Sequence, residues 1–552
     1  WGRLSLPTFF GEAKKVGRAR GADPSQKHCA SAQTTPPEQA AWSYPLEFSV
    51  KRTLFILHRW LGIALGLFML IWFFSGLVMI YAGASRVDSL TRLAHSQALP
   101  ESAPPLSAGQ AWRRAWPERA DEAPAEARLM MQAGEPMWLL IDLAGQRHML
   151  SAVDGRRVST DAARAVRLAQ DWARAAGRAA TPSFIETVRA DAGTRMMNFD
   201  PFRPLHRVAL NDADGSQLHI SAKTGEVVRV TTTISRTLTW LGSWLHFFRP
   251  LDDIGLGEQR KDILTWSAFA ACFAVLTGLW VGWQRWRPGW FGQRRYGSGQ
   301  VHPYRERWPR WHFWLGLTGG GWAMLWIFSG FLANNPWHLF SHASVRPAEL
   351  ARYHGGGLPA AALDWRAPLA TPSVELHWRR LGEHAVLLAY QADGRVSRLS
   401  EFGAPQAASA DRPAFSADEL TRAALRLYPG AQVTQHNWLS EGDAYYYPRP
   451  RGDDALDKPF PVLRLQLNDA SASWLYLDPA TGQLLKRVDR SRRAYRWLFN
   501  ALHSWDVPVL RSRPLWDGWM IIASVLGIGL GVTSLVVGGK RLARSWPWRR
   551  IR

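Results

Sequence analysis

The sequence predicts a membrane protein: a bundle of four transmembrane helices, arranged as two parallel repeats, with two α+β domains outside the membrane. Four stretches without charged residues are long enough to cross a bilayer, which takes about 20 residues; they are 60–83, 263–283, 311–333 and 518–537. The first stretch, which follows His58, is written again in the third, which begins beside His312. Mean hydropathy is only −0.20, so the long intervals between these stretches must face water.

The boundaries of the predicted segments follow from these stretches and from local composition. The segments are a disordered cytoplasmic tail (1–50), transmembrane helices at 51–83, 260–284, 311–334 and 515–539, outer domains at 84–236 and 335–493, helices lying on the outer membrane face at 237–250 and 494–506, an Arg-rich cytoplasmic loop (285–310) and a cytoplasmic tail (540–552). Each half therefore has the order helix, outer domain, surface helix, helix.

Charge sets the predicted orientation. The net charge is +22, and the basic residues gather in the loop 285–310, after Val537 and before the first helix. Basic residues flanking apolar helices mark the cytoplasmic side, so we expect both termini and that loop inside and both large domains outside. The lipid bilayer accounts for this basic excess, and no nucleic-acid partner is expected.

Each outer domain reads as a small α+β module that packs a helix on an antiparallel sheet. The first has predicted helices at 108–116 and 160–177, and strands at 128–131, 137–143, 148–152, 205–210 and 217–221. The second repeats this order, with strands within 374–399, a helix at 417–428 capped by Ser416, and further strands from Leu463 and Leu475.

Four histidines form two matched pairs in the predicted repeats. His58 corresponds to His312 near the inner face, and His246 corresponds to His503 near the outer face. Parallel repeats are related by an axis along the membrane normal, so equivalent residues face each other across it. Imidazole near hydrocarbon is uncommon unless it is hydrogen-bonded, paired or metal-bound. The pairs are candidate metal ligands, and a hydrogen bond to a neighbouring carbonyl is the simpler alternative.

Small residues accompany these histidines. They are Gly62, Gly66 and Gly76 in the first copy, and Gly316, Gly320 and Gly330 in the second. A helix face with histidine at one end and no side chains along it has room for a flat macrocycle, although small residues at this spacing are also a common helix-packing device.

The type of ligand narrows the chemistry. Two neutral imidazoles suit haem iron, and a bis-histidine haem favours electron transfer because it has no open coordination position. Zinc would need further ligands, and no carboxylate or thiol accompanies these histidines. Since the chain has no Cys-x-x-Cys-His motif, we expect haem b, two per chain.

No nucleotide-binding glycine motif follows a predicted strand, so no flavin or nicotinamide site is expected. Electrons would then come from a separate donor, either a cytosolic reductase or membrane quinol. An aromatic and basic run in the second outer domain is the candidate contact for a ferric chelate, and an exposed loop is its simpler interpretation. The run consists of Tyr445, Tyr446, Tyr447, Arg449 and Arg451.

Several motifs together resemble the PepSY-associated transmembrane family of iron-regulated and iron-uptake membrane proteins. They are Leu57-His-Arg-Trp-Leu-Gly62, Leu245-His246, Leu502-His503, Thr277-Gly278-Leu279-Trp280 and Asp478-Pro-Ala-Thr-Gly482. The second copy departs in having Thr533-Ser534 where the first has Thr277-Gly278.

The resemblance implies PepSY-like periplasmic domains, a place in the bacterial inner membrane, and ferric-siderophore reductase activity. It also implies that the family's haem histidines correspond to His58, His246, His312 and His503. Other members carry a fused flavoprotein; the sequence ends soon after Lys540, so we expect the donor in trans.

Three functions remain open at this point. We favour an oxidoreductase, an inner-membrane diheme protein that reduces a periplasmic ferric chelate, such as a ferric siderophore, and releases Fe(II). The alternative is a membrane-anchored PepSY binding or regulatory protein whose histidines are structural. A transporter ranks last, because the membrane helices lack the charged residues and helix breaks of a substrate site.

Overall fold

The computed structural model describes residues 46–82, 86–195, 197–290, 292–342, 344–368, 372–402, 414–448, 455–510 and 512–545. The chain divides into two compact units, Trp1–Lys51 and Arg52–Arg552, and the second holds nearly all the described residues. The predicted disordered tail lies outside the described residues up to position 45, as does the predicted C-terminal tail from position 546.

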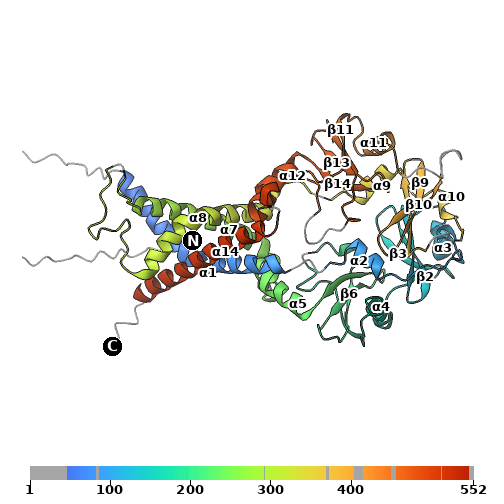
Figure 1. Cartoon of the computed structure of the whole chain (residues 1–552), viewed down its shortest axis with the longest axis horizontal. Coiled ribbons are helices and arrows are strands. Elements are labelled where there is room, and N and C mark those ends of the chain that lie inside the picture. The colour runs from blue at the N-terminus through green and yellow to red at the C-terminus, as the bar shows by residue number, and fades with distance from the viewer. Residues whose placement is uncertain are drawn as a thin grey trace, which may run out of the picture. The chain divides into compact units, whose positions relative to one another are not determined.

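Four long helices form the membrane part of the chain (Figure 1): α1 (Leu46–Tyr81), α7 (Arg260–Arg285), α8 (Arg307–Ala333) and α14 (Leu515–Ser545). All four are long and apolar enough to cross a membrane, which confirms the predicted transmembrane helices. Helix α8 begins before the predicted position 311, and α14 continues past position 539. Half of the added residues are Arg or Lys, which are good helix formers and remain hydrated at a helix end.

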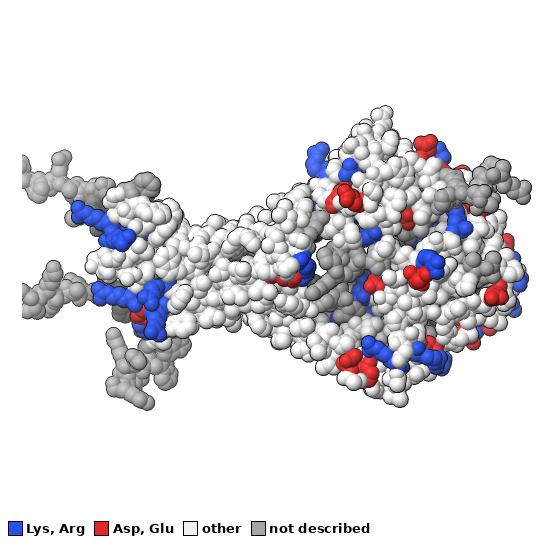
Figure 2. All heavy atoms as spheres, in the orientation of Figure 1, with Lys and Arg blue, Asp and Glu red and all other residues white. Residues whose placement is uncertain are grey.

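Glycines allow the long helices to approach closely. A Cβ added at Gly527 of α14 would lie 2.5 Å from the ring of Phe73 on α1, and one at Gly531 would lie 3.0 Å from the backbone of Leu70. Figure 2 shows the visible face of these helices almost free of charge between their ends, with Lys and Arg gathered at the end of the bundle where α14 ends.

The outer segments contain three antiparallel sheets. The first has the strand order β10-β9-β8-β1-β2-β3, the second β4-β5-β6-β7 and the third β11-β12-β13-β14. Their strands are β1 (Glu126–Gln132), β2 (Glu135–Ile141), β3 (Arg147–Ser151), β4 (Ser183–Val188), β5 (Leu205–Ala209), β6 (Gln217–Ser221), β7 (Val227–Thr231), β8 (Glu375–Leu381), β9 (His384–Tyr390), β10 (Val396–Phe402), β11 (Val433–Leu439), β12 (Val462–Leu467), β13 (Trp474–Leu477) and β14 (Leu484–Val488).

The six-stranded sheet joins the two predicted outer domains. Strand β1 of the first segment pairs antiparallel with β8 of the second, with Leu129 opposite Leu376 and Arg128 opposite His377. Each three-stranded meander alone would leave an edge strand with unpaired backbone groups, and joining the two edges satisfies them. The fully buried rings of Trp138 and Trp378 meet edge to face at 5.0 Å across the joint.

Amphipathic helices cover the two smaller sheets, as predicted. Helix α4 (Ala162–Ala175) is capped by Asp161 and buries its apolar face on β5 and β6. Helix α11 (Ala417–Leu425) begins with a capping box between Ser416 and Glu419 and packs on β12 and β13. The other short outer helices are α2 (Ser89–Ala94), α3 (Ala108–Ala115), α9 (Pro347–His354) and α10 (Ala360–Leu363), with 3-10 turns at Pro117–Arg119, Asp200–Phe202, Pro336–His338 and Pro508–Leu510.

The two segments predicted as surface helices are irregular. The first is α5 (Thr233–Thr239), a π-helical turn (Trp240–Trp244) and α6 (Pro250–Asp253); the second is α12 (Arg490–Tyr495), a π-helical turn (Arg496–Ala501) and α13 (Leu502–Ser504). A π-turn inserts an extra residue into the helical ladder and is common at functional sites. Here each π-turn comes just before a histidine of the outer pair.

A hydrogen bond between the buried His219 and the half-buried Asp191 ties the sheet β4–β7 to the loop after β4. The Nε2 atom of His219 donates to Oδ2 of Asp191 at 2.8 Å. Burial lowers the pKa of His219, and the bond to Asp191 only partly opposes this. Burial raises the pKa of Asp191, but hydrogen bonds from His219 and Thr194 outweigh it and hold that pKa below its usual range. Both groups therefore bind fewer protons in the folded chain.

Candidate functional site

The inner histidine pair joins all four long helices. His58 of α1 and His312 of α8 have ring centroids 6.2 Å apart and ring planes inclined by 32°. The Nδ1 of His58 donates to the carbonyl oxygen of Ala274 on α7 at 2.9 Å, and the Nδ1 of His312 lies 3.2 Å from Oγ1 of Thr533 on α14. Each ring is thus oriented by a helix other than its own.

A cavity of about 330 Å³ lies beside the inner pair. Its lining contains both histidines, the basic residues Arg59, Arg285 and Arg541, and glycines from every long helix. The predicted residues among these glycines are Gly62, Gly66, Gly316 and Gly320. A Cβ at Gly62 or Gly316 would meet only atoms at 3.8 Å or beyond, so these two positions leave open space.

The outer pair is built in the same way from different elements. His246 and His503 follow the two π-turns, and their ring centroids are 6.2 Å apart with planes inclined by 74°. Their Nδ1 atoms lie 3.1 Å from Oγ of Ser75 on α1 and 3.1 Å from Oγ of Ser329 on α8.

Two tryptophans of the long helices anchor the backbones of the outer histidines. The indole Nε1 of Trp72 donates to the carbonyl of His246 at 3.1 Å, and that of Trp326 donates to the carbonyl of His503 at 2.8 Å. In each outer histidine, the backbone carbonyl is held by a tryptophan and the imidazole by a serine. The tryptophan and the serine lie three residues apart, within one turn of the same long helix.

A second cavity, of about 360 Å³, lies beside the outer pair and is lined mainly by aromatic and aliphatic side chains. Gly76 and Gly330 belong here: a Cβ at Gly76 would lie 3.8 Å from Cε1 of His246, and one at Gly330 would lie 3.4 Å from Cε1 of His503. This corrects the prediction that Gly76 makes room beside His58. His58 and Gly76 are 18 residues apart on α1, which corresponds to about 27 Å of helix. Gly76 therefore lies on the same face of α1 as His58 but near the other end of the bundle.

Hydrogen bonding fixes the tautomer of all four histidines. Ala274 offers only a carbonyl oxygen to His58, so that Nδ1 carries the proton. The hydroxyls of Ser75, Ser329 and Thr533 each donate to a carbonyl of the preceding turn, which leaves their lone pairs to accept from the imidazoles. The Nε2 lone pair of each ring is then available for a metal, the usual state of a ligating histidine.

The two pairs have the spacing of axial ligands. A metal ion lies about 2 Å from an imidazole nitrogen, and that nitrogen lies roughly 1 Å from the ring centre, so two axial imidazoles have centroids about 6 Å apart. The four Nε2 atoms have no hydrogen-bond partner among the described residues. Neither cavity lining includes a carboxylate or a thiol.

Four positions of the site had no role assigned from the sequence. Gly278 lies against His58, where a Cβ would be 2.6 Å from Cε1 of that ring. Ser75, Ser329 and Thr533 orient the other three rings. The motif Trp-x-x-Ser-Gly, present at Trp72 and again at Trp326, carries both serines and both anchoring tryptophans, and its repetition beside the histidines is the signal that could have found them.

The predicted chelate contacts are mostly internal. Tyr446 is fully buried and stacks on Tyr476 at 5.2 Å, so it cannot touch a ligand from solvent. The hydroxyl of Tyr445 lies 3.1 Å from the indole nitrogen of Trp497, and that of Tyr447 bonds to Asp506. These bonds attach the β11–β12 connection to the chain on both sides of His503. Arg449 and Arg451 lie outside the described residues.

The sequence of the chain matches one family model, the PepSY-associated TM region, over residues 55–402. The chain belongs to this family. The matched stretch contains three of the four site histidines, both serine–glycine motifs and the shared sheet, and it ends at the last residue of β10. No curated protein matches the chain. In this member of the PepSY-associated TM family, the histidines of the matched stretch line cavities between the long helices of the membrane part.

Proposed function

We propose that this protein carries electrons across the bacterial inner membrane, as a diheme b-type oxidoreductase that reduces a ferric chelate on the periplasmic side. The observation that carries the proposal is that the four histidines form two pairs, each beside a cavity, with ring centroids 6.2 Å apart and with Nδ1 rather than Nε2 in a hydrogen bond. Hydrogen-bonded structural histidines would satisfy Nδ1 in the same way, but they would not leave four unpartnered Nε2 atoms at the spacing of axial ligands.

The proposal includes two parallel repeats. Ser75 with His246 and Ser329 with His503 make the same contact at the same distance of 3.1 Å. Strands β1 and β8 pair antiparallel, as a strand and its own copy do across a two-fold axis. Such an axis would also bring His58 opposite His312. These correspondences support the repeat that the sequence indicates.

The residues present fit haem b. His58 and His312 would hold one group and His246 with His503 the other, with neutral imidazoles oriented by the partners of their Nδ1 atoms. Glycines along the inner cavity keep side chains out of the space beside the rings, and Arg59, Arg285 and Arg541 offer positive charge to carboxylates of a bound ligand. A bis-histidine haem b supplies one-electron transfer with no open coordination position.

The two sites would lie at different depths of the membrane. His58 and Ser75 are separated by about 17 residues of α1, roughly 25 Å at 1.5 Å per residue. The basic residues of the loop 285–310 favour a cytoplasmic position for the inner site, and hence a periplasmic position for the sheets. Electrons would enter from a cytosolic reductase or quinol and leave near the outer site to a ferric siderophore or similar chelate, releasing Fe(II).

A spectrum and a stoichiometry test the proposal. We expect the purified protein to show b-type bands in a reduced-minus-oxidised spectrum and two haems per chain in a pyridine haemochrome assay. Reduced protein should also reoxidise when a ferric siderophore is added. A protein without b-type bands when expressed with ample haem, and with unchanged behaviour after His58→Ala and His312→Ala, would instead be a PepSY binding or regulatory protein.

A further inference from the structure

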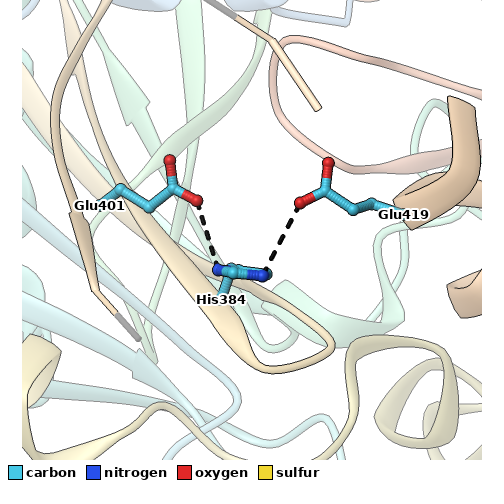
Figure 3. Close-up of side chains that lie close together, drawn as sticks. All are labelled: His384, Glu401 and Glu419. Carbon is cyan, nitrogen blue, oxygen red and sulfur yellow. Dashed lines mark ion pairs between the residues drawn. The ribbon is translucent and has the colours of Figure 1, made fainter. Parts of the chain in front are cut away.

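Three side chains far from both cavities meet at the edge of the second outer segment (Figure 3). His384, the first residue of β9, lies between two carboxylates from different elements. Its Nδ1 is 3.3 Å from Oε1 of Glu401 on β10, and its Nε2 is 3.7 Å from Oε1 of Glu419 in the first turn of α11. One atom from each residue can be chosen so that all three lie within 4.8 Å of one another.

Glu401 is the least ordinary member of this cluster. Its side chain is 1% exposed, and neither carboxylate oxygen has a hydrogen-bond partner among the described residues. A buried carboxylate without hydrogen bonds is costly, so such a group normally has a cation beside it. The guanidinium of Arg398 lies 3.6 Å from Oε2 of Glu401, which leaves Oε1 facing His384.

Glu419, in contrast to Glu401, is held by hydrogen bonds. Its Oε2 accepts hydrogen bonds from the backbone nitrogen of Ser416 at 2.8 Å and from the Ser416 hydroxyl at 2.7 Å. This capping box fixes the carboxylate at the start of α11, with Oε1 directed toward His384 (Figure 3). The His384 side chain is 23% exposed, so an ion can reach the cluster from solvent, past the imidazole.

We infer that His384, Glu401 and Glu419 form a binding site for a divalent first-row transition-metal ion, with Zn²⁺ as the ion of best fit. One imidazole and two carboxylates are an N/O ligand set that zinc accepts at about 2.0–2.2 Å, with ligand atoms roughly 3 to 4 Å apart. Calcium and magnesium prefer six or more oxygen ligands and fit less well. The two carboxylates balance the charge of the ion.

Only one nitrogen of His384 can bind the ion. The other nitrogen then donates to a carboxylate oxygen, which is the usual second contact of a metal-bound histidine. The ion would join β9, β10 and the start of α11, so its binding would stabilise the attachment of this helix to the edge of the six-stranded sheet. A protonated His384 bridging the two glutamates without an ion is the competing arrangement.

Zinc binding to the full-length protein in detergent tests the inference. Chelator-stripped protein is dialysed against buffered Zn²⁺, and bound zinc per chain is measured by elemental analysis beside the thermal unfolding midpoint. We expect one zinc ion per chain that Glu401→Gln and His384→Ala lose, through an affinity about 100-fold weaker or more. Zinc should raise the unfolding midpoint of the wild type and not that of these variants.

Two comparisons make the result specific. Asp393→Asn removes an exposed carboxylate from the turn between β9 and β10, and should bind zinc like the wild type. Far-UV circular dichroism checks that Glu401→Gln, which keeps the shape of the side chain, is folded. Equal zinc stoichiometry and affinity in wild type and Glu401→Gln would overturn the inference. So would wild-type protein that takes up no zinc, which would leave the bridging His384 as the explanation.

Discussion

Gly278 offers the sharpest test of the inner site, because one methyl group should displace one ligand. A Cβ at this position of α7 would lie 2.6 Å from Cε1 and 3.0 Å from Nδ1 of His58. Carbon atoms in contact prefer about 3.5–4.0 Å, so Gly278→Ala requires the imidazole to move by roughly 1 Å. That movement breaks the 2.9 Å bond from Nδ1 to the Ala274 carbonyl, at a cost of about 1 kcal/mol.

The same movement shifts Nε2 of His58 relative to the ring of His312, whose centroid lies 6.2 Å from that of His58. Binding groups need to be placed to within about 0.5 Å, so we expect Gly278→Ala to lose the inner haem and keep the outer one. The haemochrome assay should fall from two haems per chain to one. Alanine is the better helix former by about 1 kcal/mol, so α7 itself is not weakened.

A second glycine of the bundle provides the control for Gly278→Ala. Gly321→Ala places a methyl on α8 where no atom lies within 4 Å, and it should retain both haems. The remaining outer haem of Gly278→Ala reports that the bundle has folded. Two haems per chain with an unchanged low-spin spectrum in Gly278→Ala would refute the assignment of His58 as a ligand.

Three further outcomes are expected. His503→Ala should remove the outer haem and leave a single haem per chain, and full haem content would contradict the proposed outer site. Trp138→Ala empties a fully buried position in the joint of the shared sheet and should cost about 3–5 kcal/mol; Val153→Ala, at a side chain 50% exposed, should change the denaturation midpoint little. The free energy of unfolding should fall as pH drops through about 6.5 and again near 4, because His219 and Asp191 bind more protons in the unfolded chain. His219→Gln should flatten the first of these steps in a series of unfolding midpoints against pH, and an unchanged slope would contradict it.

Much of the membrane part could be predicted from the sequence. An apolar run of about 20 residues has few alternatives to a membrane helix, and its charged ends indicate the side on which it begins. The internal repeat, which pairs His58 with His312 and His246 with His503, selected four of the sixteen histidines, and the structure brings these four together as two pairs with ring centroids 6.2 Å apart. Repetition was informative because two copies of one chain segment tend to place equivalent residues opposite each other.

Other features depend on neighbours that are distant in sequence. The burial of Tyr446 depends on Tyr476 and Phe460, which no local pattern connects to it. The assignment of Gly76 to the outer pair depends on where the first π-containing segment, which carries His246, crosses α1. The cluster of His384, Glu401 and Glu419 comes from three elements, each unremarkable by itself.

The sequence by itself determined the membrane helices, the helices that cover the smaller sheets, and the four histidines of the candidate site. These follow from periodicity, capping residues and repetition, which act over a few turns or copy a whole segment. Only the tertiary structure decided that β1 and β8 join the two outer segments, that Nδ1 of each histidine is occupied, and that the glycines divide between two cavities. Each of these depends on which backbone edge or hydroxyl remains unpaired once the local elements have formed, and that is decided when the elements pack.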